Sequence, residues 1–188
     1  MMFYWLSWFL IIYLFFFYRA KQSVKQLLIV CLLLNIILLR YEVTIIQFTI
    51  SFPFILGSLL LFLLIGSRSF SIKSGFTLWC LVLSYVGLHY IFIASPIWLI
   101  VNSQLLIGGS LIIMVVFTNR EFWDQVLCFL IASWLGEALL AYNLQILNWQ
   151  HPLGSNFFYS YIYLGIAILY LINYATKKGG QKLVRMNL

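Results

Sequence analysis

The chain has 188 residues, of which 64% are hydrophobic and only 8% are charged, and its formal net charge at pH 7 is +7. Soluble domains of this length carry about 25% charged residues, so the composition excludes an aqueous fold. The positive charge does not indicate nucleic-acid binding, because the basic residues lie in short segments between apolar runs, where they set membrane topology. The apolar runs are continuous and do not alternate with period two, so we expect an all-α, polytopic helical membrane protein.

Seven apolar runs predict about seven transmembrane helices in one integral membrane domain, residues 1–188, with no soluble domain. A helix needs roughly 20 apolar residues to cross the hydrocarbon core of a bilayer. The second run is short and the third contains Pro53, so residues 27–65 are either two full spans or one span and a re-entrant piece. The expected spans are residues 3–18, 27–39, 43–65, 75–94, 97–117, 126–147 and 157–174.

The basic residues predict the orientation of the chain. With seven crossings and the N-terminus outside, ten of the eleven lysines and arginines fall on the cytoplasmic side, and only Arg40 lies outside. Lys and Arg accumulate in cytoplasmic loops, whereas six or eight crossings would spread these charges over both sides. We therefore expect a cytoplasmic C-terminus and a location in the cell membrane.

One carboxyl group, that of Glu137, lies in the middle of the apolar run 126–147. A charge at this depth costs roughly 2.5–3.5 kcal/mol, so the group must be either protonated or paired, and it is a candidate functional residue. Counting about 1.5 Å per residue from the proposed outer ends places four further polar residues in the outer half of the membrane. These are His89, Asn102, Gln104 and Tyr142. We predict a ligand or proton site in a polar cleft with Glu137 at its floor.

A structural role is the alternative for each of these residues. Asn, Gln and His in membrane helices commonly hydrogen-bond between helices. For Glu137 the corresponding alternative is a neutral carboxyl group that clasps two helices. His151, in a loop with Pro152 and Gly154, is expected to be an exposed interfacial residue.

Small residues predict where helices approach each other closely. Ala132 and Gly136 form a small-xxx-small pair on the sixth run, and Gly108 and Gly109 offer a similar approach on the fifth. No metal or cofactor site is predicted, because one histidine and one glutamate do not supply the three or four ligands that a metal usually needs.

The sequence contains none of the common hydrolase or phosphate-binding motifs. We therefore expect a non-enzymatic accessory or binding component, with the lipid bilayer and another membrane protein as partners. One alternative is a small proton-coupled transporter that uses Glu137. It is less favoured because transporters often consist of internal repeats, and this sequence shows none. The second alternative is a membrane-embedded enzyme that uses Glu137 and His89.

Two segments resemble a known family. Residues Tyr85–Phe92, which run into Ser95-Pro-Ile-Trp98, and residues Leu135–Tyr142 are similar to the YphA-type multi-pass membrane proteins of endospore-forming bacteria. The resemblance extends over most of the chain. It implies a bacterial plasma membrane, and hence an N-terminus outside the cell, but it supplies no catalytic residues.

Overall fold

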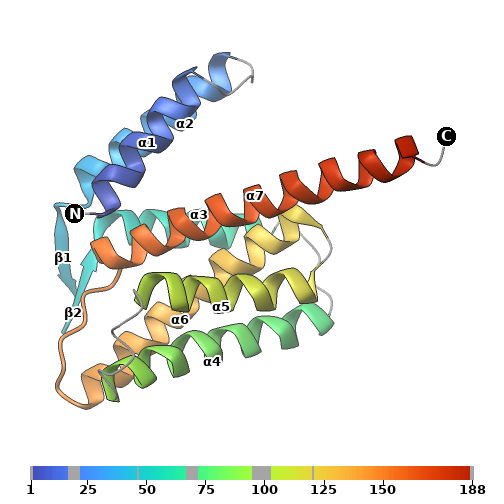
Figure 1. The fold of residues 1–188 in the computed structure, drawn as a ribbon. Coiled ribbons are helices and arrows are strands. Elements are labelled where there is room, and N and C mark those ends of the chain that lie inside the picture. The colour runs from blue at the N-terminus through green and yellow to red at the C-terminus, as the bar shows by residue number, and fades with distance from the viewer. Residues whose placement is uncertain are drawn as a thin grey trace.

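The computed structural model describes residues 2–16, 22–45, 47–66, 72–94, 103–119 and 121–186. Within these ranges the chain forms seven helices and one β-hairpin, which confirms the predicted all-α membrane fold class (Figure 1). The elements are α1 (Met2–Phe16), α2 (Gln22–Leu38), β1 (Glu42–Ile45), β2 (Phe48–Ser51), α3 (Phe52–Gly66), α4 (Ile72–Ala94), α5 (Ser103–Thr118), α6 (Phe122–Ile146) and α7 (Asn156–Met186).

Three helices contain stretches that are long and apolar enough to cross a membrane: Gly75–Ala94 of α4, Phe122–Ile146 of α6 and Asn156–Thr176 of α7. The other four helices contain apolar stretches of 10–17 residues. Large hydrophobic side chains also cover the outer surface, including Phe62, Phe76 and Phe117, each more than 70% exposed. Helices that are apolar on all sides suit lipid surroundings, and the protein is a multi-pass membrane protein.

The helices α4, α5, α6 and α7 pack together and contain most of the buried core. α4 packs along α6, and α5 packs against α7 (Figure 1). α1 and α2 lie side by side and rise away from the other helices in this view. The first turn of α1 also contacts α7, where the ring of Phe3 stacks on that of Tyr163 with centroids 5.7 Å apart. The core therefore lies between α4, α5, α6 and α7.

The prediction of a helix over residues 43–65 is wrong for its first part. The helix begins only at Phe52, and the residues before it form a β-hairpin. β1 and β2 pair antiparallel, from Glu42 opposite Ser51 to Ile45 opposite Phe48. The segment is rich in Val, Ile and Thr, whose branched Cβ atoms favour strands. Pro53 lies in the first turn of α3, where a missing N–H removes no helical hydrogen bond.

The hairpin lies where α1, α3 and α7 begin and α2, α4 and α6 end; we refer to this as the hairpin end of the molecule (Figure 1). The loop between α6 and α7, residues 147–155, adds to the hairpin. Ser51 N–H donates to Leu153 O at 3.0 Å, and Leu153 N–H donates to Thr49 O at 2.8 Å. Gly154 has a φ of +72° and lies against the side chains of Ser51 and Phe54. The hairpin thus fixes the path of this loop.

Candidate functional site

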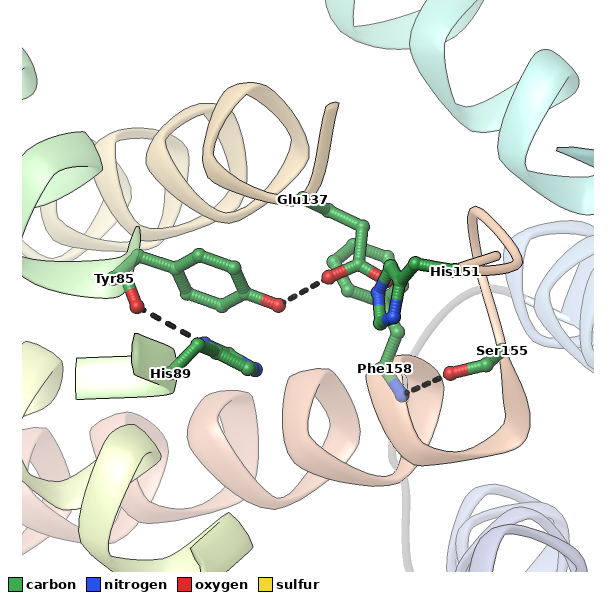
Figure 2. A network of polar contacts seen from close by, with 6 residues as sticks. All are labelled: Tyr85, His89, Glu137, His151, Ser155 and Phe158. Atoms are coloured by element: carbon green, nitrogen blue, oxygen red, sulfur yellow. Dashed lines mark hydrogen bonds and ion pairs between the residues drawn. The ribbon is translucent and has the colours of Figure 1, made fainter. Parts of the chain in front are cut away.

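Glu137 projects from α6 into the core, where it faces α4 and the loop of residues 147–155. Only 2% of its surface is exposed. The hydroxyl group of Tyr85, on α4, donates a hydrogen bond to Glu137 Oε2 at 2.5 Å. On the other side, His151 Nε2 lies 3.1 Å from Glu137 Oε1. Figure 2 shows the carboxyl group between these two side chains. Both carboxyl oxygens therefore have a partner, as a buried ionisable group requires.

The helix positions explain how Tyr85 reaches Glu137. Gly136 precedes the glutamate and faces α4, where the Tyr85 side chain packs directly on its backbone. A Cβ atom at position 136 would lie 2.6 Å from Tyr85 Cδ1 and 3.0 Å from Tyr85 Cβ. Only glycine leaves this space, so Gly136 allows the contact between α4 and α6 that the small-residue pattern predicted.

The position of His151 differs from the prediction. We expected an exposed interfacial residue, but its side chain is only 26% exposed and contacts Glu137. The contact depends on the loop that returns from the end of α6 and pairs with β2 through Leu153. No local pattern encodes such a long-range pairing. The only available signal was that a buried carboxyl group needs a polar partner.

The structure brings together only some of the predicted site residues. His89 lies one turn after Tyr85 on α4, and its Nδ1 atom is 2.9 Å from Tyr85 O (Figure 2). It therefore flanks the site, but its hydrogen bond joins it to Tyr85. Tyr142, on α6, is 58% exposed, and its assignment to the site stays a prediction. Asn102 and the side chain of Gln104 lie outside the described residues.

Neighbouring helices approach the predicted packing residues to different distances. Ala132 is buried on α6 next to the core. A Cβ atom at Gly108 would lie 3.3 Å from the Tyr161 ring of α7, whereas one at Gly109 would meet nothing within 4 Å. Close packing therefore involves Gly108 and Gly136 but not Gly109.

One turn before Glu137, a separate pair of buried hydroxyl groups lies next to the site. Ser133, one turn earlier on α6, hydrogen-bonds to the buried hydroxyl group of Tyr161 and donates to Phe129 O at 2.6 Å. Toward the end opposite the hairpin, the buried side chains of the described residues are mostly apolar, apart from Gln125 near the start of α6. Buried residues there include Leu111, Val115, Val126, Phe129 and Leu169. The network therefore extends from Glu137 to the hairpin end only.

A cavity of about 310 Å³ lies at the hairpin end, above the site. Its volume is at the lower end of the range for small-ligand pockets, about 300–1,000 Å³. The wall comes from the hairpin, the end of α6 and the following loop. The lining residues are Gln47, Phe48, Thr49, Ala141, Gln145, Asn148, Trp149, Gln150 and His151. His151 thus belongs both to the pocket wall and to the Glu137 site, so a single contact links the two.

The described residues contain no group of three or more His, Cys, Asp or Glu side chains that could hold a metal ion. Glu137 and His151 alone provide two potential ligands, and both are engaged with each other. The chemistry that this part of the molecule offers is hydrogen bonding and proton exchange between carboxyl, imidazole and phenol groups.

A family model described as YphA-like integral membrane protein matches residues 1–184. Neither a curated protein nor a solved structure matches the sequence. The match covers the hairpin, the pocket and all residues of the Glu137 site, and it confirms the resemblance noted for the segments around Tyr85 and Glu137.

Proposed function

The chain belongs to the YphA-like integral membrane protein family, and within it we propose that this protein is a non-enzymatic binding component whose pocket at the hairpin end receives a small ligand. One observation carries the proposal. His151 lines the pocket and also contacts the buried carboxyl group of Glu137. A ligand in the pocket would therefore contact His151, the side chain that also contacts Glu137 inside the helix bundle.

The consequence of binding follows from this link. Glu137 also accepts a hydrogen bond from Tyr85, so the contacts run from the pocket to α6 and on to α4. Buried polar groups in a low dielectric are strongly affected when a partner moves. A ligand that holds or displaces His151 therefore changes how α4 and α6 fit together. Both helices expose apolar side chains such as Phe76 and Leu135, where another membrane protein could detect the change.

The alternative, a proton-coupled transporter that uses Glu137, requires polar access from both sides of the membrane. The described hydrogen bonds of Glu137 reach only toward the hairpin end, and beyond Ser133 and Tyr161 most buried side chains are apolar, with Gln125 near the start of α6 as a polar exception. This one-sided arrangement favours binding over transport. Flux through proteoliposomes distinguishes transport from binding.

We expect seven crossings with the N-terminus and the hairpin end outside, so that the pocket opens away from the cytoplasm. The reason is that this orientation places ten of the eleven basic residues on the cytoplasmic side and only Arg40 outside. A reporter that is active only in the cytoplasm should be active when fused after Leu188 and silent when inserted at Gly154. The opposite pattern would place the pocket on the cytoplasmic side.

The binding role predicts that a small polar molecule stabilises the purified protein against heat. A ligand at about 100 times its Kd stabilises a protein by about 2.7 kcal/mol. The panel should contain neutral, cationic and anionic compounds. A compound that shifts the melting temperature of the wild type should shift that of Gln150→Ala less at the same concentration, because the variant alters the pocket wall.

Two outcomes would contradict this role. If no compound in the panel changes the melting temperature, the pocket is not a binding site for small polar ligands. If proteoliposomes carry protons or the bound compound, and Glu137→Gln abolishes this flux, the protein is a transporter. Liposomes with Trp8→Leu, a substitution at an exposed position of α1, serve as the control for intact insertion.

A further inference from the structure

We propose that the ligand of this pocket is an uncharged, hydroxyl-rich ring, either a free sugar or the glycosyl headgroup of a neutral glycolipid. The inference rests on the proposed binding function and specifies the chemistry of its ligand. It is drawn from the side chains that line the pocket and from the position of the pocket at the end of the membrane helices.

The pocket wall carries no lysine, arginine, aspartate or glutamate among its nine lining residues. Among these nine described residues, His151 is the only ionisable one, and the Glu137 carboxyl group already occupies its Nε2 atom. A charged ligand that enters such a site loses hydration and finds no opposite charge, which is costly. An uncharged ligand avoids this cost.

Amide side chains dominate the polar part of the wall. They are Gln47, Gln145, Asn148 and Gln150. Gln145 Nε2 donates to Gln47 Oε1 at 2.6 Å, which joins α6 to the hairpin across the pocket. Within the described residues, the side chains of Asn148 and Gln150 make no hydrogen bond. Because each amide offers both donors and an acceptor, the best ligand group is one that also does both, and a hydroxyl group does.

Two aromatic rings, those of Phe48 and Trp149, complete the wall. Trp149 is 54% exposed, so part of its surface remains available. Aromatic rings carry a negative face, on which the C–H face of a sugar ring can pack while its hydroxyl groups meet the amides. The backbone N–H group of Trp149 donates to Leu144 O at 2.9 Å, and Asn148 takes up a left-handed φ of 57°. This tight turn after α6 holds Trp149 beside the pocket.

The test uses sugars that share one ring and differ in charge. Purified wild-type protein, in a detergent without a sugar headgroup, is melted with glucose, maltose, cationic glucosamine or anionic glucuronate. We expect the neutral sugars to raise the melting temperature by several degrees and the charged ones to have little effect. Trp149→Leu and Gln150→Ala should weaken binding about tenfold or more. Trp8→Leu, which removes a tryptophan of similar exposure on α1, should bind normally.

A second arm identifies the source of the sugar. In nanodiscs, the protein is compared in phosphatidylglycerol alone and with added monoglucosyl diacylglycerol. A shift with this lipid but not with free glucose assigns the site to a lipid headgroup, and the reverse assigns it to a free sugar. If glucosamine or glucuronate binds better than glucose, or if Trp149→Leu and Gln150→Ala bind like the wild type, the inference is wrong while the binding function stands. If no compound of either arm or of the wider panel binds, the proposed function itself fails.

Discussion

Glu137→Leu should lower the free energy of unfolding by about 2 kcal/mol, because it removes the acceptor of a fully buried hydroxyl group. Tyr85 has no exposed surface, so its O–H group would have no alternative partner in water. Leaving a buried donor unsatisfied costs about 1–3 kcal/mol. His151, which is 26% exposed, can turn to water and adds less. Scanning fluorimetry of the purified protein in one detergent measures the change in melting temperature.

Glu137→Gln is the matched variant and should cost less than about 1 kcal/mol. Its carbonyl oxygen can accept from Tyr85, and its amide group can donate to a neutral His151 ring. Tyr142→Phe, which changes an exposed tyrosine five residues further along α6, should melt like the wild type. A leucine variant as stable as the wild type would show that the three residues are not coupled.

A double variant sharpens this test. In the Glu137→Leu background, Tyr85→Phe removes the hydroxyl group that the first substitution left without an acceptor. Replacing both partners of a buried polar contact by apolar groups is often nearly neutral. The double variant should therefore recover part of the stability that Glu137→Leu loses. Strict additivity of the two single effects would argue against the direct hydrogen bond.

The buried acid and its helix could be predicted from the sequence, because a lone carboxyl group in a long apolar run is conspicuous. The depth of Tyr142 along α6 does not fix the direction in which its side chain points. Residues five positions apart on a helix, at about 100° per residue, point in clearly different directions. Ser133 and Ala141, four residues from Glu137 on either side, are both buried, as their shared face requires.

The hairpin and the role of His151 could not be predicted, for a related reason. An apolar run rich in β-branched residues suits either a strand or a buried helix, and composition does not separate them. Once β1 and β2 form, Leu153 pairs with β2, and this pairing places His151 over Glu137. The site is thus completed by contacts between the hairpin and a segment about 100 residues later in the sequence. No local pattern encodes such contacts.

Gly136→Ala should lower the free energy of unfolding by about 1–3 kcal/mol, the usual cost of overpacking a core. The added methyl group would lie 2.6–3.0 Å from three atoms at the base of the Tyr85 side chain. Rotation of the ring cannot relieve this, because one of these atoms is Tyr85 Cβ. The ring is also confined by His89 and Tyr161, with centroids 4.3 and 5.8 Å away. α4 and α6 must therefore move apart.

Two other glycines provide matched controls. A Cβ atom at Gly87, on the exposed side of α4, or at Gly109 on α5 would meet nothing within 4 Å. Gly87→Ala and Gly109→Ala should therefore leave the melting temperature unchanged or raise it slightly, since alanine restricts the unfolded chain. If Gly136→Ala melts like these controls, α4 and α6 are not in the close contact described above.

The Gly136 variant also tests whether the helix contact and the polar site depend on each other. If α4 moves away from α6, the Tyr85 hydroxyl group no longer reaches Glu137, so Tyr85→Phe should cost less in the Gly136→Ala background than in the wild type. The difference between these two costs is the coupling energy of a double-mutant cycle. A coupling near zero would mean that Tyr85 keeps its hydrogen bond despite the added methyl group. A coupling close to the full cost of Tyr85→Phe would mean that Gly136 holds Tyr85 against Glu137, and through it the connection from α4 to His151.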